Sequence, residues 1–117
     1  MHSSFTFSKD TVGFLIDGNV NEKAINKLQI EILEKLKSFD KINLYLEDSN
    51  IESFTLPAIV NQLMFKLEHG DRFRKIAIVT DRKWIHMCGS IENIFLSGTL
   101  KNFDISERLK AMNWISS

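Results

Sequence analysis

The chain has 117 residues, 44% hydrophobic and 26% charged, a composition typical of a globular protein with one hydrophobic core. Fifteen basic and fifteen acidic side chains give a formal net charge of zero, which argues against a nucleic-acid-binding protein. The single cysteine, Cys88, excludes an intramolecular disulfide and a thiolate metal cluster within one chain. We see no signal peptide and no apolar run of the roughly 20 residues that span a bilayer, so we expect one cytoplasmic domain over residues 1–117.

The N-terminal part predicts a β-hairpin followed by a helix. Residues 4–8 and 12–17 are expected to form its two strands, and Gly18-Asn19 is expected to end the second. Asn21 is suited to cap the helix. Apolar residues then recur at spacings of three and four over about five helical turns. These residues are Ile25, Leu28, Ile32, Leu36 and Phe39.

The middle of the chain predicts a third strand and a second helix. Residues 42–47 alternate between apolar and polar, and residues 48–50 are expected to form a loop. Ser53 or Thr55 can cap the helix, Pro57 is tolerated in its first turn, and Gly70 is expected to end it. The apolar positions expected to face the core are Leu56, Ile59, Val60, Leu63, Met64 and Leu67.

The C-terminal part predicts two further strands and two further helices. Residues 74–79 are apolar on both faces, as in a strand covered by helices on both sides. Thr80 or Asp81 is expected to cap a helix from 82 to about 96, and residues 99–103 are expected to form an edge strand. In the last helix we expect Ser106 at the cap and an inward face of Leu109, Met112 and Ile115.

The predicted order ββαβαβαβα indicates an α/β fold in a single domain. Because strands alternate with helices, we expect a mixed, mainly parallel five-stranded sheet with right-handed crossovers and four helices. The first hairpin then supplies an antiparallel edge.

Two stretches carry a resemblance to a known family. Residues 74–84 read Arg-Lys-Ile-Ala-Ile-Val-Thr-Asp-Arg-Lys-Trp, and the tail runs from Phe103-Asp104-Ile105 to Trp114-Ile115. With the element order, they resemble the SpoIIAA-like (STAS/SEC14-like) small bacterial proteins over essentially the whole chain. The resemblance implies a related sheet with helices, and kinship with anti-sigma-factor antagonists and lipid-carrying CRAL-TRIO domains. A shared fold does not by itself transfer function.

The phosphoacceptor of the antagonists is missing at the corresponding place. Those proteins carry an Asp-Ser-Ser-Gly-like motif after the third strand, whereas residues 51–57 here read Ile-Glu-Ser-Phe-Thr-Leu-Pro. An alternative function is still a phosphorylation-controlled regulator with Ser53 or Thr55 as the acceptor, because a phosphate at a helix N-terminus is electrostatically favoured.

The third predicted helix has a wider apolar arc than a surface helix needs. Gly89 and Ser90 weaken its middle. We interpret this combination as a mobile cover over an apolar pocket, or as a dimer contact; the alternative is the apolar surface that small domains expose without a function. The expected core stripe is Trp84, Met87, Cys88, Ile91, Ile94 and Phe95, with Ile85 and Leu96 outside its centre.

The leading functional hypothesis is therefore a non-enzymatic binding module without a cofactor. It would bind an apolar small molecule or lipid, a membrane surface or a protein partner, including a second copy of the chain, through the third helix. The residues predicted to line its binding site are Trp84, Ile85, Met87, Ile91, Phe95 and Leu96.

Charged and nucleophilic residues suggest other sites. Asp81, Arg82 and Lys83 lie beside a helix N-terminus, where an anion can bind, although charge runs usually form solvated surface. Asp48 and Asp81 follow parallel strands, and with Lys83 they would indicate an enzyme if they clustered in a cleft. We do not expect Cys88 to pair with His86, because residues two apart on a helix point about 200° apart.

Overall fold

The chain forms five strands and four helices in the predicted order. The computed structural model describes residues 2–117, except for the side chains of Thr6, Phe7 and Phe95. The elements are β1 (His2–Ser8), β2 (Thr11–Val20), α1 (Glu22–Leu36), β3 (Ile42–Phe54), α2 (Leu56–Glu68), β4 (Phe73–Val79), α3 (Lys83–Phe95), β5 (Thr99–Phe103) and α4 (Arg108–Ser116). Short 3₁₀ turns, Gly70–Arg72 and Ile105–Glu107, precede β4 and α4.

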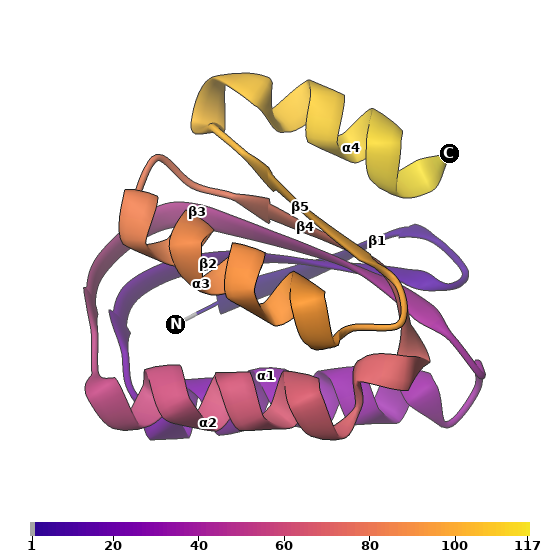
Figure 1. Ribbon diagram of the computed structural model, residues 1–117, viewed down its shortest axis with the longest axis horizontal. Helices are drawn as coiled ribbons and strands as arrows, with labels where there is room; N and C mark the ends of the chain where they lie inside the picture. The colour runs from indigo at the N-terminus through magenta and orange to yellow at the C-terminus, as the bar shows by residue number, and fades with distance from the viewer. Residues whose placement is uncertain (1) are drawn as a thin grey trace.

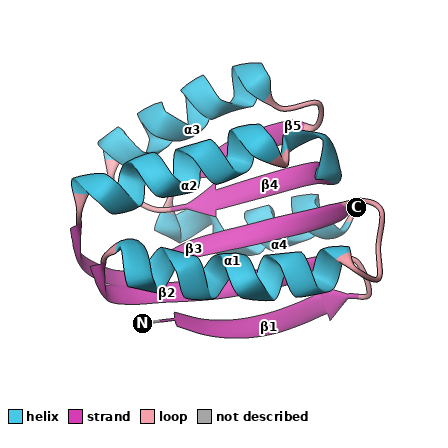
Figure 2. Ribbon diagram, turned by 90° about the horizontal axis from the view of Figure 1, so that it is seen from below, coloured by secondary structure: helices cyan, strands magenta, loops and turns pink. Residues whose placement is uncertain are grey.

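The sheet is mixed and mainly parallel, as predicted. Its strand order is β1-β2-β3-β4-β5, with β1 antiparallel to β2 and the other neighbours parallel. The three crossover helices α1, α2 and α3 lie on one face of the sheet, and α4 covers the other (Figures 1 and 2). This arrangement follows from right-handed crossovers between successive neighbouring strands. None of the described helices is long and apolar enough to cross a membrane.

The sheet has a hydrophobic core on each face. The larger core lies under α1, α2 and α3, and the smaller one packs Tyr45, Ala77 and Phe103 against α4. Helix α1 has the predicted cap, since the Asn21 side chain accepts a hydrogen bond from the Ala24 N–H. It also buries four residues of the predicted stripe, Ile25, Leu28, Ile32 and Leu36. The fifth, Phe39, lies beyond the end of the helix at Leu36 and is partly buried.

Strands β2 and β3 continue beyond their predicted ends. The prediction that Gly18-Asn19 ends the second strand is wrong, because β2 pairs with β3 as far as Val20 and Phe54. Gly18 adopts φ +70°, a left-handed conformation that glycine takes without strain, and the register shifts on both sides of it. Residues 48–50, expected to form a loop, are part of this irregular extension.

Helix α2 turns a different face inward from the one predicted. It buries Ala58, Phe65 and Lys66, whereas Leu56, Val60, Met64 and Leu67 are exposed. The reason is that Lys66 meets the buried carboxylate of Glu92 on α3, so a charged residue can occupy an inward position. Thr55 caps α2, as one of the two predicted alternatives, by accepting a hydrogen bond from the Ala58 N–H.

Helix α3 is likewise rotated relative to the predicted stripe. Met87, Ile91 and Ile94 are exposed, and Gly89 and Glu92 are buried. Gly89 allows the helix to approach the sheet, because a Cβ atom there would lie 2.8 Å from Asn102 Oδ1. Close packing therefore accounts for a glycine in the middle of this helix.

The predicted caps of the last two helices are also corrected. Helix α3 starts after Arg82 without a side-chain cap, and the Asp81 carboxylate instead accepts the Ile105 N–H. Before α4, a reciprocal capping box of Asp104 and Glu107 replaces the expected Ser106 cap. Helix α4 buries Ala111 and Ile115, whereas Leu109, expected inside, is 72% exposed.

Candidate functional site

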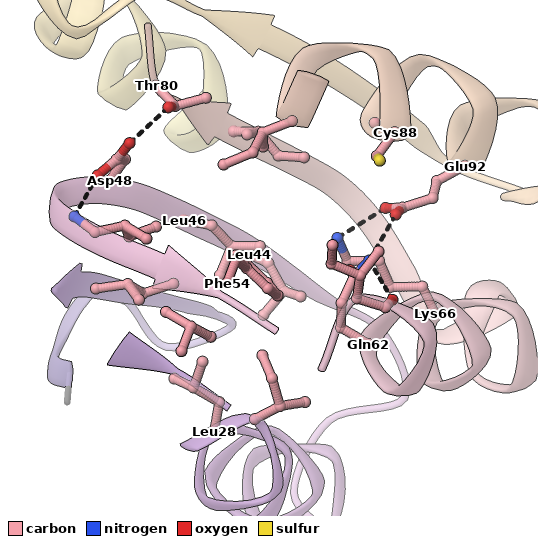
Figure 3. A pocket seen from close by; sticks show the side chains of 18 of the residues that line it. Leu28, Leu44, Leu46, Asp48, Phe54, Gln62, Lys66, Thr80, Cys88 and Glu92 are labelled. Atoms are coloured by element: carbon pink, nitrogen blue, oxygen red, sulfur yellow. Dashed lines mark hydrogen bonds and ion pairs between the residues drawn. The ribbon is translucent and has the colours of Figure 1, made fainter. Parts of the chain in front are cut away.

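A pocket of about 110 Å³ lies between the sheet and the three helices on its α1–α3 face. Alternate residues of β3 point to the same face of the sheet, so Leu44 and Leu46 both reach it. Phe54, at the end of the same strand, lines it as well, and Leu28 closes it from α1 (Figure 3). The wall of the pocket is thus mainly apolar and is built from elements distant in sequence.

Three polar side chains of α2 and α3 meet at one end of the pocket. Lys66 Nζ donates to Glu92 Oε1 at 2.8 Å, and Gln62 Nε2 donates to Glu92 Oε2 at 3.2 Å. Only 8% of Lys66 and 2% of Glu92 are exposed. Figure 3 shows this cluster at the right, next to the apolar wall. The pair thus brings one positive and one negative charge to the edge of an apolar space.

A second polar cluster lies at the other end of the pocket and joins β3 to β4. The Asp48 carboxylate accepts hydrogen bonds from the Ile51 N–H at 2.9 Å and from the Thr80 hydroxyl at 2.8 Å. Arg82 Nε also donates to it at 2.8 Å, and the Arg82 guanidinium contacts the Ile51 carbonyl oxygen. Because the Asp48 carboxylate is already bonded by three groups of the protein, we infer that this cluster stabilises the irregular end of β3.

The predicted lining residues of α3 separate into two groups. Trp84 and Ile85 line the pocket, and Leu96 packs partly buried against the larger core. Met87 and Ile91 point to the outer surface instead. The sixth, Phe95, has a side chain outside the described part of the chain. Sequence reasoning missed Leu44 and Leu46 as lining residues, although their alternation in β3 was visible.

Trp84 stands at the edge of the pocket. Its indole is 39% exposed and packs edge-to-face on the Phe54 ring, with the ring centroids 5.5 Å apart. One aromatic comes from the start of α3 and the other from the end of β3. Both line the pocket, so a molecule inside it would contact an indole that is also partly in solvent.

Cys88 lines the pocket, but its surroundings do not activate it. Burial raises the pKa of the thiol, and the nearby Glu92 carboxylate raises it further. Near neutral pH the group is therefore a neutral thiol, which is a weak nucleophile. The imidazole of His86 contacts the Phe103 carbonyl oxygen at 3.1 Å rather than Cys88.

The outer faces of α2 and α3 expose two apolar stripes with the same spacing. Each has three residues, separated by four and then three positions, and each side chain is between 40% and 77% exposed. These stripes, which we call the outer stripes, are Val60, Met64 and Leu67 on α2 and Met87, Ile91 and Ile94 on α3. The two helices lie side by side (Figure 2).

The residues of the alternative sites are dispersed or already bonded. Of the predicted anion-binding residues, Asp81 accepts the Ile105 N–H, Arg82 holds Asp48, and Lys83 is exposed. The Ser53 hydroxyl is exposed and donates to Asn19 Oδ1 at 2.7 Å, and Thr55 caps α2. Among the described residues, no group of three histidine, cysteine or acidic side chains is arranged to hold a metal.

Comparison with known proteins identifies a family and a solved structure with the same fold. A family model described as SpoIIAA-like matches residues 11–116. An uncharacterised protein of the DUF3478 family with a SpoIIAA-like fold, from Shewanella loihica PV-4, superimposes with a TM-score of 0.73. The alignment covers 98% of this chain and 92% of that one at 18% identity, a level that establishes a common fold alone. No protein with a curated function matches the chain.

Proposed function

The chain belongs to the SpoIIAA-like family, and from this premise and the pocket we propose that it is a non-enzymatic module that binds an apolar small molecule. The ligand, or the apolar end of a longer one, would occupy the space between the sheet and helices α1, α2 and α3. The observation that carries the proposal is the apolar wall of that space.

The volume of the pocket limits what it can take. About 110 Å³ is comparable with engineered cavities of about 150 Å³ that stay dry and bind benzene. A ligand gains about 0.8 kcal/mol for each CH₂ group that it buries. A six-carbon chain or a small ring is therefore the natural occupant. A longer chain would leave the pocket beside Trp84, which is partly exposed.

The test is a calorimetric titration of the purified, delipidated protein with benzene, a neutral ring of the size that the pocket can hold. We expect saturable binding to the wild type. Cys88→Phe places an aromatic ring in the pocket and should weaken binding at least tenfold. Met87→Phe makes a comparable change on the outer face of the same helix and should leave binding unchanged.

The outcome of this comparison is decisive in both directions. Circular dichroism and urea unfolding establish whether each variant is folded. If Cys88→Phe does not fold, Leu46→Phe replaces it, because this substitution fills the same pocket from β3. Equal binding by the wild type and the filled variants would exclude the pocket as the site. Loss of binding in Met87→Phe alone would place the site on the outer face.

A second candidate function is self-association through the outer stripes. Monomeric proteins rarely expose large contiguous apolar patches without a functional reason. The six side chains carry no charge, so two copies could pack this surface against itself about a twofold axis without burying an ion. Helix α1 would stay outside the contact.

Sedimentation velocity over a hundredfold range of concentration tests this candidate. We expect a dimer whose dissociation constant rises at least tenfold in Met64→Lys or Ile91→Lys, and no change in Leu109→Lys, an exposed leucine of α4 on the other face. A wild type that sediments as a monomer at every concentration would rule self-association out.

A further inference from the structure

Lys66 has more hydrogen-bond donors than partners. An ammonium group carries three N–H donors. One is used by Glu92 Oε1 at 2.8 Å, and among the residues that the structure describes no other acceptor is bonded to Lys66 Nζ. The side chain is nevertheless buried at the edge of the pocket. Two charged N–H donors therefore face a space that no described protein acceptor fills.

The side-chain oxygen of Gln62 is a hydrogen-bond acceptor that no described protein donor uses. Its amide nitrogen donates to the Ile59 carbonyl oxygen at 3.0 Å and to Glu92 Oε2 at 3.2 Å. Both N–H donors of the amide are thus used, and Gln62 Oε1 has no donor within the described part of the chain. The Gln62 amide, whose oxygen no described donor uses, thus bonds the same carboxylate as Lys66, and both residues line the pocket (Figure 3).

The local charge selects against an anionic ligand. Glu92 is 98% buried and already neutralises Lys66, so the cluster has no net charge to offer. A ligand carboxylate or phosphate brought to Lys66 would also approach the Glu92 carboxylate in a region of low dielectric, where like charges repel strongly. A neutral group that both accepts and donates fits these partners better.

We propose that the pocket takes an amphipathic ligand with a neutral hydroxyl head, the simplest representative being a medium-chain primary alcohol. The hydroxyl oxygen accepts from Lys66 Nζ, its proton is donated to Gln62 Oε1, and the alkyl chain lies along the wall of Leu44 and Leu46. This deepens the proposed function and rests on it, because the alkyl chain occupies the same pocket.

The experiment compares three ligands of similar size by calorimetric titration: hexan-1-ol, 1-methoxypentane and hexanoate. The ether has the same heavy atoms as the alcohol but cannot donate a hydrogen bond. In the wild type we expect hexan-1-ol to bind about fivefold more tightly than the ether, as one net hydrogen bond provides. Hydration alone would give the opposite order of affinities, because the ether is less strongly hydrated than the alcohol and loses less when it leaves water.

Two variants identify the groups responsible. Gln62→Leu removes the acceptor but keeps the Lys66–Glu92 pair, and it should abolish the preference for the alcohol over the ether. Asn61→Leu replaces an amide by the same side chain one residue earlier, where Asn61 bonds Glu22 and Asn26 of α1 and does not line the pocket, and the preference should persist. Glu92→Gln leaves Lys66 without its counter-ion and should raise the affinity for hexanoate relative to hexan-1-ol at least tenfold.

The outcomes separate the two proposals. If none of the three ligands binds, or if binding is the same in Cys88→Phe, the proposed function itself fails. If all three bind the wild type, but the ether binds as tightly as the alcohol, the hydroxyl head is refuted and the apolar pocket stands. An unchanged ratio of hexanoate to alcohol in a folded Glu92→Gln variant would equally refute the charge argument.

Discussion

The buried ion pair between α2 and α3 gives the sharpest stability prediction. Lys66→Met removes the cation and leaves the Glu92 carboxylate with Gln62 as its remaining partner. Glu92→Met leaves an ammonium group buried without an anion. The double variant replaces both charges by apolar side chains in a mainly apolar setting. The three variants and the wild type form a double-mutant cycle.

The magnitudes follow from distance and burial. Two unit charges 2.8 Å apart attract by about 6 kcal/mol at an effective dielectric constant of about 20. Withdrawing each ion from water costs several kcal/mol, so the net value of the pair is small. Removing one partner leaves that penalty uncompensated. We expect each single variant to lose about 3–5 kcal/mol of stability, and the double variant to lie within about 1 kcal/mol of the wild type or above it.

Urea unfolding followed by circular dichroism measures these differences from the midpoint and slope. The exposed pair of Lys37 and Glu34 provides the control, because its side chains are 73% and 70% accessible and three residues apart. We expect Lys37→Met to change stability by less than about 0.5 kcal/mol.

The reasoning would be refuted by single variants that lose less than about 1 kcal/mol, because Lys66 and Glu92 would then be hydrated in solution. It would also be refuted by a double variant as unstable as the sum of the single ones, since that result would show no coupling between the two charges.

Three further outcomes are expected. Gly89→Ala should lower stability by about 1–2 kcal/mol, because the added Cβ would crowd Asn102. Helix propensity alone predicts higher stability for the alanine variant, and that result would contradict the close packing at Gly89. The alkylation rate of Cys88 should still be rising at pH 9.0, because burial raises the thiol pKa above that ordinary value, and a rate that levels off below pH 9.0 would disprove that environment. The hydrogen bond from Arg74 lowers the pKa of Asp10. The pair therefore contributes to the free energy of unfolding above about pH 4, and this contribution is lost as the pH falls through the lowered pKa. The stability difference between wild type and Arg74→Ala, below about 1 kcal/mol for this exposed pair, should therefore vanish in acid; a constant difference would refute the assignment.

The element order and the sheet could be predicted from the sequence because their signals are local. Alternation, helical spacing and the caps at Asn21 and Thr55 each depend on a few neighbouring residues. Residues 74–79 are apolar on both faces, and this pattern correctly predicted a strand that is covered by helices on both sides. The long extension of β2 past Gly18 escaped prediction because it depends on pairing with β3 across the sheet.

The inward faces of α2 and α3 could not be predicted from hydrophobicity. Each helix has an apolar stripe that the structure leaves outside, and each turns a charged residue inward. Lys66 and Glu92 are acceptable there only because they meet each other, and 26 residues separate them in the chain. Of the residues predicted to bind a ligand, Trp84 and Ile85 lie at this pocket, and its polar end was not predicted.

The most direct test of ligand binding is to identify what the folded protein carries when it is purified. The wild type, Cys88→Phe and Met87→Phe would be purified in parallel, extracted with organic solvent and analysed by quantitative mass spectrometry. We predict one small apolar compound, near one mole per mole of protein, in the wild type and in Met87→Phe, and its loss from Cys88→Phe. The same trace compounds in all three proteins, far below one equivalent, would contradict the account.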